Sequence, residues 1–422
     1  MGDISTEGDG AAGIYSVAGT GDATITAGNI TTEGDSAEGI ESYVTTGDAT
    51  ITAGDISTLG NYVDGIYSDV TTGDATITAG DIATLGDYAG GIYSFVANGN
   101  ATITAGNILT TGDGAVGIYS AINTGDATIT AGNITTTGDG YDDNSHTMLA
   151  HGIWAVLSDS GTANVSIFND HQIAVTGAGA DGINLDTLND HVRIVNTGTI
   201  SSAQFYGIYD TGTDTIITNS GTISGPAGAV KFAGTGNTLS LLAGSKIVGV
   251  LAGMGGNTLS IGSRLNTALA YTNTSTVTIT TSGIPYVAYG GVLAVVDPTL
   301  FAAEDDMVAD LSRSVGNAID ARLGSAIGQS ANTIMASTSN AQATGAQWET
   351  WATGLASYRA QGEEGLNDGF DTTLGGFALG SDTVLSSGTR FGGFVGASQA
   401  HLNTSAGNEQ IDSASTYAGI YA

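Results

Sequence analysis

The residues that could perform nucleophilic chemistry lie in one short segment, GDSAEG at 34–39. Its Gly-Asp-Ser triplet resembles the nucleophile site of serine hydrolases, but a serine nucleophile requires a positioned base. No histidine precedes His146, and the column of the repeat that contains Ser36 otherwise carries Gly or Tyr. The pattern therefore favours a turn, and we expect no catalytic residues and no enzymatic activity.

Histidines and carboxylates also lie close together further along, where a divalent metal could bind. The segment contains Asp142, Asp143, His146 and His151, and imidazole and carboxylate are both accepted by such metals. The spacing of the two histidines matches no established ligand pattern. A solvated loop is the favoured interpretation, and the metal site is the alternative.

Aspartates recur every 26 residues and form columns. Stacked in successive coils, such carboxylates would lie about 5 Å apart and repel by roughly 1 kcal/mol per pair in water. Screening by solvent and salt would relieve this repulsion, and so would bridging by Ca²⁺. The calcium-binding nonapeptide is absent, so we expect no cofactor and keep Ca²⁺ as the alternative. Its candidate ligands are Asp9, Asp35, Asp22, Asp48 and Asp74.

Tyrosines form another column, interrupted once by Glu41. Each follows an isoleucine that we expect to be buried, so the alternation of a strand turns the ring toward solvent. A row of rings offers a binding surface, and it equally offers a stacking ladder that stiffens one face. Both interpretations stay open, with the ladder favoured, for Tyr15, Tyr67, Tyr93 and Tyr119.

These columns imply a repeat in which every coil has the same backbone. Alternating segments such as ATIT end at Gly-Asp or Gly-Asn, which tolerate the left-handed conformation of a tight corner. Three short strands and three corners per period predict an all-β fold, a right-handed parallel β-helix in which identical residues stack. The aliphatic columns that would fill its interior are Ile14, Ile40, Ile66, Ile92 and Ile118; Ile25, Ile51, Ile77, Ile103 and Ile129; Ile30, Ile56, Ile82, Ile108 and Ile134; and Val44, Val70, Val96 and Ile122.

Composition restricts the partners of this solenoid. The chain has 422 residues, a formal net charge of −33 and no cysteine. Before the first basic residue, Arg193, there are 25 of the 41 acidic residues. Such a field repels nucleic acid, and the lack of cysteine excludes disulfides. The chain opens without a recognisable signal peptide.

The last third of the sequence changes character. Residues spaced by four from Met307 to Ile327 predict an amphipathic helix. Its slim polar side would fit a narrow water-lined tube, although docking on any apolar surface fits the pattern too. Alternating segments of about ten residues follow, with aromatic residues near their ends, as in transmembrane β-barrel strands.

The order of these segments resembles a known family. A β-helix is followed by VVDPTLFAAEDD at 295–306, by the helix, and then by WETWATGLASYRAQ and FDTTLGGFALGSD. With Gly369, Asp371 and Gly376, this pattern is similar to that of classical autotransporters of the type V secretion pathway. The resemblance implies a passenger exported through the outer membrane of a Gram-negative bacterium, with the barrel-assembly machinery as a partner. It also implies a helix that threads the pore and an antiparallel transmembrane barrel, of which this sequence would contain only the first strands.

We therefore expect four regions: passenger repeats at 1–235, regular to about 138; distal, autochaperone-like coils at 236–294; a linker with the helix at 295–347; and barrel strands at 348–422. Because the repeat begins in mid-coil and four strands cannot close a barrel, we expect a fragment at both ends. The favoured function is contact with host or bacterial surface ligands or with other copies of the chain. A rigid stalk for a lost N-terminal domain is the alternative, and a carbohydrate-active enzyme is less favoured.

Overall fold

The structure is a computed structural model that describes residues 2–142, 147–148, 150–157, 163–187, 191–273, 276–324, 348–364, 369–405 and 410–422. The chain forms two compact units, residues 1–282 with 286–296 and residues 283–285 with 297–422. No helix formed by the described residues is long and apolar enough to cross a membrane.

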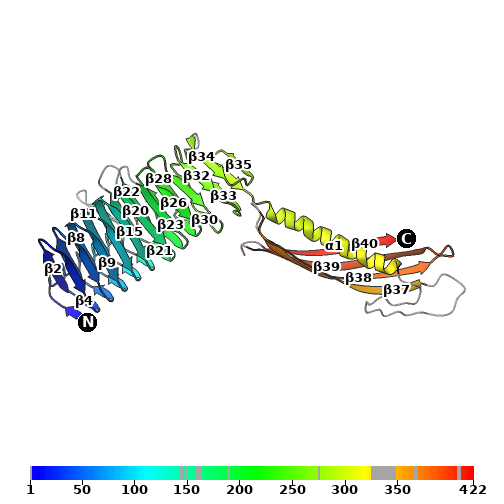
Figure 1. Ribbon diagram of the computed structural model, residues 1–422, viewed down its shortest axis with the longest axis horizontal. Coiled ribbons are helices and arrows are strands. Elements are labelled where there is room, and N and C mark those ends of the chain that lie inside the picture. Colours follow the sequence, from blue (N-terminus) through cyan, green and yellow to red (C-terminus); the bar gives the residue numbers. More distant parts are fainter. Residues whose placement is uncertain are drawn as a thin grey trace. The chain divides into compact units, whose positions relative to one another are not determined.

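The first unit is a parallel β-solenoid, in which the described residues form three sheets of ten, ten and eleven strands (Figure 1). Sheet A contains β1 (Ile4–Thr6), β4 (Ile30–Thr32), β7 (Ile56–Thr58), β10 (Ile82–Thr84), β13 (Ile108–Thr110), β16 (Ile134–Thr136), β21 (Gln172–Val175), β24 (Thr199–Ser202), β27 (Thr222–Ser224) and β30 (Lys246–Val248). Sheet B contains β2 (Ile14–Ala18), β5 (Ile40–Val44), β8 (Ile66–Thr72), β11 (Ile92–Asn98), β14 (Ile118–Thr124), β19 (Ile153–Leu157), β22 (Ile183–Thr187), β25 (Tyr206–Asp210), β28 (Gly228–Phe232) and β31 (Leu251–Ala252). Sheet C contains β3 (Ala23–Thr26), β6 (Ala49–Thr52), β9 (Ala75–Ala79), β12 (Ala101–Ala105), β15 (Asp126–Ala131), β20 (Asn164–Asn169), β23 (His191–Asn196), β26 (Ile216–Asn219), β29 (Thr238–Leu241), β32 (Thr258–Ile261) and β34 (Thr278–Thr281).

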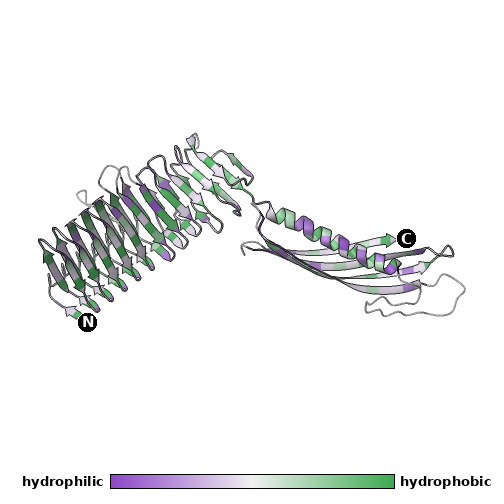
Figure 2. Ribbon diagram, in the orientation of Figure 1, coloured by the Kyte–Doolittle hydropathy of each residue, from purple (hydrophilic) through white to green (hydrophobic). Residues whose placement is uncertain are grey.

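The predicted aliphatic columns are confirmed as the solenoid core. Ile25 pairs with Ile51 and Ile51 with Ile77 in parallel register, and all three side chains are buried. One coil could not bury this face alone, whereas stacked coils cover one another. The result is a continuous aliphatic interior, and hydrophobic positions recur from coil to coil along the solenoid (Figure 2).

The corners are held by hydrogen bonds between side chain and backbone that link successive coils. The backbone N–H of Asp48 donates to Oδ1 of Asp22 at 3.0 Å, and the N–H of Asp74 donates to Oδ1 of Asp48 at 2.9 Å. Glycine is required beside them: Gly47 has φ +132°, and a Cβ there would lie 2.3 Å from the carbonyl oxygen of Gly21. The Gly-Asp repeat is therefore a backbone requirement of the fold.

The regular repeat ends where the sequence predicts an insertion. Ile118 pairs with Ile153, and the intervening chain includes a small antiparallel pair, β17 (Tyr141–Asp142) with β18 (Thr147–Met148). The three sheets continue across residue 235. Near the end of the unit lies an antiparallel sheet of β33 (Thr267–Ala270), β36 (Val292–Val295) and β35 (Tyr286–Tyr289).

The second unit packs helix α1 (Thr299–Leu323) on an antiparallel sheet of four strands. These are β37 (Trp348–Gln361), β38 (Phe370–Val384), β39 (Arg390–Thr404) and β40 (Gln410–Tyr421), in chain order across the sheet. The predicted helix is confirmed, but it begins before the acidic EDD segment. Oδ1 of Asp297 accepts the N–H of Thr299 at 2.8 Å and thereby orders its first turn.

Candidate functional site: two faces of the sheet and the solenoid surfaces

The four-stranded sheet has one face against α1 and one face away from it. Ala303 of α1 packs on Phe370 and Leu402, and strand alternation assigns every second residue to each face. The face away from the helix carries large apolar side chains that are exposed. They are Trp348, Phe377, Leu379, Phe391, Val395 and Ile420.

This apolar face has the height of a membrane-facing band. On β37 it extends from Trp348 to Tyr358, whose side chain is 70% exposed. Ten residue steps at about 3.4 Å cover about 34 Å along the strand. At a strand tilt of about 45° this projects to about 24 Å, close to the apolar band of about 25 Å in outer-membrane barrels.

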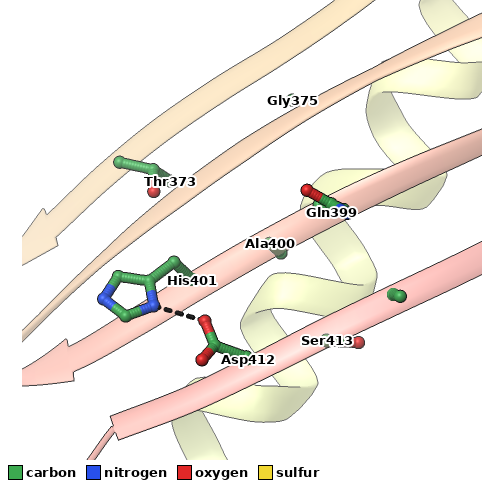
Figure 3. A pocket seen from close by; sticks show the side chains of 8 residues that line it. Thr373, Gly375, Gln399, Ala400, His401, Asp412 and Ser413 are labelled. Carbon is green, nitrogen blue, oxygen red and sulfur yellow. Dashed lines mark hydrogen bonds and ion pairs between the residues drawn. The ribbon is translucent and has the colours of Figure 1, made fainter.

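A polar row borders the apolar band on the same face. Thr373, His401 and Asp412 pair side by side across β38, β39 and β40. Nδ1 of His401 lies 2.6 Å from Oδ1 of Asp412, and the two side chains point toward each other in a shallow hollow over Gly375 (Figure 3). In a barrel of this kind, these hydrogen-bonding groups would lie at the edge of the apolar band, where the lipid hydrocarbon meets the polar interface.

The face toward α1 carries a buried ionic cluster at the C-terminal end of the helix. Arg322 donates to both carboxylate oxygens of Asp382, from Nε at 2.7 Å and from Nη2 at 3.0 Å, and to Glu349 at 2.6 Å. Arg390 and the hydroxyl of Tyr421 also donate to Asp382. Charges removed from water need such complete pairing, so this cluster fixes one position of the helix.

A second cluster holds the first half of α1 with the opposite polarity. Arg359 of β37 donates to both oxygens of Asp310 at 3.0 Å and lies 3.0 Å from Oδ2 of Asp306. Twelve residue steps from Asp310 to Arg322 correspond to about 18 Å of helix. Acid on the first half of the helix and base on the second half therefore define the direction in which it lies on the sheet.

Glycines on this face make room for aromatic rings. A Cβ on Gly396 would lie 2.2 Å from the ring of Tyr417, and one on Gly380 would lie 2.3 Å from the ring of Trp351. The hydroxyl of Tyr417 donates to the carbonyl oxygen of Phe377 at 2.9 Å. The two rings therefore cover glycine positions of neighbouring strands, and Ile319 of α1 packs against the cluster that Trp351 forms with Ala378 and Tyr421.

Sequence reasoning missed these ion pairs and predicted an apolar stripe alone. Met307 on that stripe is buried, but Leu323 is 37% exposed while its neighbour Arg322 is buried. Ile327 lies outside the described residues. A signal was present: residues 297–422 contain four basic residues, and each forms an ion pair, namely Arg313, Arg322, Arg359 and Arg390.

On the solenoid, the predicted tyrosine row forms a ladder. Tyr67 stacks on Tyr93 with ring centroids 4.9 Å apart, and Tyr93 on Tyr119 at 4.5 Å. Tyr43 bridges the gap at Glu41, because its ring lies 6.2 Å from that of Tyr15 and 5.5 Å from that of Tyr67. Ring faces that stack on one another are not open to a ligand, so this geometry supports the ladder, and binding by the row stays a prediction.

The aspartate columns have a structural explanation that does not need a metal. Asn100 replaces Asp in one column and keeps both bonds: its N–H donates to Asp74, and its Oδ1 accepts the N–H of Asp126 at 2.9 Å. A neutral amide therefore does the work of a carboxylate. The described residues contain no cluster of three or more His, Cys, Asp or Glu placed to hold a metal ion, and each Asp keeps one oxygen free for solvent or Ca²⁺.

The remaining candidate residues are not brought together. Ser36 lies at a corner with φ 54°, and its backbone N–H donates to the carbonyl oxygen of Asn61. Asp143 and His146 lie outside the described residues. His151 is buried, and its Nδ1 accepts the N–H of Asp181 at 2.8 Å. This bond requires a neutral imidazole with the proton on Nε2.

Burial shifts both titratable groups of this pair. It lowers the pKa of His151 to about 3 and raises the pKa of Asp181 to about 6. The carboxylate of Asp181 keeps two donors, the amide of Asn184 at 2.9 Å and the N–H of Tyr206 at 3.1 Å. The pair makes the stability of the solenoid depend on pH.

Comparison with known proteins identifies the C-terminal sheet. The family model for the autotransporter beta-domain matches residues 350–422, which cover β38, β39, β40 and nearly all of β37. A search of curated proteins and a search of solved structures each gave no match.

Proposed function

We infer that this chain, which has the β-solenoid, the helix and the β-domain of a classical autotransporter, anchors a surface passenger in the outer membrane of a Gram-negative bacterium. The observation that carries this inference is the two-faced sheet. Its outward face is an apolar band about 24 Å high, and its other face holds α1 through buried ion pairs. Insertion of such a sheet is the task of the barrel-assembly machinery.

We propose further that the solenoid acts by contact, as an adhesin or by self-association, and not as an enzyme. Its surface is long and repetitive, and its corner aspartates accept backbone N–H groups of the next coil. Ser36 and His151 have backbone roles, and no basic residue precedes Arg193. A carbohydrate-active enzyme of this shape would need carboxylates clustered with Arg or Lys.

The alternative contact role is that of a rigid stalk, which the continuous hydrogen-bonded ladders also support. A stalk would hold another domain away from the membrane without binding anything itself. An adhesin would retain binding when the solenoid is the sole displayed part.

Surface display tests both levels of the proposal. The chain, continued at its C-terminus by the further strands of a closed autotransporter barrel, is produced behind a cleavable export signal in a Gram-negative host. It carries the single substitution Thr52→Cys, at an exposed position on the outward side of β6. A membrane-impermeant maleimide should label intact cells, and these cells should adhere to host matrix or to one another more than cells that display residues 297–422. Labelling without added adherence would support the stalk function over the adhesin function. Absence of labelling in correctly inserted protein would refute surface display.

A further inference from the structure

Two neighbouring coils differ from the others at one corner. The corner after sheet A carries Leu59 and Tyr62 in one coil and Leu85 and Tyr88 in the next. The flanking coils have small or polar residues at these positions, namely Glu7 and Gly10, Glu33 and Ser36, Thr111 and Gly114, and Thr137 and Gly140. Because all these coils share one backbone, the fold itself does not require the large side chains.

These four residues, of which Tyr88 is half-buried and the other three are exposed, form an apolar surface, which we call the corner patch. Leu59 is 44% exposed, Leu85 45% and Tyr62 62%. The rings of Tyr62 and Tyr88 stack in parallel, with centroids 4.9 Å apart and planes 4° apart. Large apolar groups on adjacent coils at a solvent-facing corner are a typical feature of an interaction site.

The two tyrosines of the patch lie on backbone with positive φ, which is a strained conformation for a large side chain. Tyr62 has φ 57° and Tyr88 has φ 56°, a conformation that bulky L residues rarely adopt. Glycine occupies the same corner at Gly10 with φ 67° and at Gly114 with φ 68°. Tyrosine is therefore retained at this corner against a local preference for glycine, as is found at functional positions.

The surroundings of the patch are acidic. Asp35, Asp87 and Asp113 are exposed at the same corner, and Glu33 precedes the patch in the Leu column. On the adjoining face of sheet A, a groove runs over the small side chains of Ser57 and Ala83, with Asp55 and Asp81 of the corner that precedes sheet A along one side. No lysine or arginine occurs before Arg193 to neutralise this charge.

We propose that the corner patch and the adjoining groove dock a basic, apolar segment of a partner protein, in which Lys or Arg alternates with aliphatic residues. Carboxylates steer and pair the cations, the outer faces of the stacked tyrosine pair accept cations, and the leucines cover the aliphatic side chains. The proposal rests on the contact function inferred above and names the chemical class of its partner.

The test replaces the patch by the residues of the next coil. The full chain with Leu59→Thr, Tyr62→Gly, Leu85→Thr and Tyr88→Gly is compared with wild type and with a control, Phe168→Thr with Ile216→Thr. The control removes exposed apolar side chains of sheet C, which are 42% and 44% exposed. The probe is a labelled peptide of alternating Lys and Leu, with Lys–Ser and Glu–Leu peptides as comparisons, and all chains are held in the same non-ionic amphipol.

We expect the Kd for the Lys–Leu peptide to rise at least tenfold in the patch variant and to stay unchanged in the control. The Tm of the patch variant should equal or exceed that of wild type, because glycine relieves the positive φ. The Lys–Ser and Glu–Leu peptides should bind wild type at least tenfold more weakly than Lys–Leu.

Equal binding of the Lys–Leu peptide by wild type and patch variant would overturn the proposal. So would a patch variant that melts several degrees below wild type, since the tyrosines would then be structural. Binding of a neutral oligosaccharide in place of the peptide would assign the patch to a glycan instead. If the patch variant binds the peptide like wild type while displaying cells still adhere, only the patch proposal is refuted and the contact function is supported.

Discussion

The aspartate columns allow a direct separation of hydrogen bonding from charge. Asp48 accepts the backbone N–H of Asp74 and lies in a column between two further carboxylates, Asp22 and Asp74. Asp48→Asn keeps the acceptor oxygen and removes the charge, whereas Asp48→Ala removes both. The difference between the two variants therefore measures the hydrogen bond alone.

The magnitudes follow from the coil spacing. At about 4.8 Å, each carboxylate neighbour repels Asp48 by about 1 kcal/mol in water, and physiological salt reduces this with a Debye length of about 8 Å. Both variants gain this relief. The lost hydrogen bond costs Asp48→Ala about 1 kcal/mol relative to Asp48→Asn, which corresponds to about 2 °C in Tm.

The assay is thermal unfolding of the full chain, followed by circular dichroism at low and physiological salt, with and without Ca²⁺ at matched ionic strength. Asn should melt above Ala at both salt concentrations, and above wild type most clearly at low salt. Asn and Ala variants that melt together would refute the hydrogen-bond account. A Ca²⁺-dependent rise in the Tm of wild type that Asp48→Asn abolishes would establish the metal-bridged alternative.

Three further results are expected. Arg322→Met leaves the buried Asp382 without its bidentate partner and should destabilise the docked helix by about 3–5 kcal/mol, seen as faster proteolysis of α1. Gly396→Ala should lower the Tm of the C-terminal unit, because its Cβ would meet the ring of Tyr417. Burial raises the pKa of Asp181 to about 6, above its value in the unfolded chain. The contribution of Asp181 to the free energy of unfolding is therefore complete below about pH 4 and falls by at most about 3 kcal/mol as the pH rises past 6. Asp181→Asn should remove this loss from a pH series of unfolding free energies and leave the acid-side loss caused by His151.

Controls for these results lie in the same elements. Arg313 pairs with Asp310 on α1 but is 61% exposed, so Arg313→Met should cost less than about 1 kcal/mol. Gly375→Ala lies on the outward face, where a Cβ meets nothing within 4 Å, and should be neutral. Equal losses at Arg313 and Arg322 would contradict a role for burial in the cluster.

The solenoid could be predicted from the sequence because its repeat aligns the chain with itself. Fixed columns of isoleucine identify the interior, and Gly-Asp pairs identify the corners. The inward threonines of sheet A were not anticipated: Thr84 is buried and donates to the carbonyl oxygen of Ala89 at 2.5 Å. In an alternating strand a threonine is normally assigned to the surface. No sequence pattern indicates that its hydroxyl will donate to a backbone carbonyl five residues later.

The ion pairs of the second unit could not be predicted from periodicity. Arg322 and Asp382 are 60 residues apart and meet because α1 packs on the sheet, in which β37 places Glu349 beside Asp382. Helical periodicity favoured Leu323 at that turn, but a buried arginine with a complete set of acceptors displaced it. Tyr43 was missed for a similar reason, since it lies two residues after the tyrosine column, on the same face of the strand, and enters the ladder through its ring.

The central claim, that one face of the four-stranded sheet meets lipid while the other holds α1, is tested by labelling positions on both faces of β39. The chain contains no cysteine, so Val395, Ala397, Ser398 and Ala400 are each replaced by Cys and spin-labelled in lipid vesicles, in the chain continued by the further strands of a closed barrel. Accessibility to dissolved oxygen should follow the two faces, high at 395 and 397 and low at 398 and 400. Equal accessibility at all four positions, or the opposite phase, would contradict the assignment of the two faces.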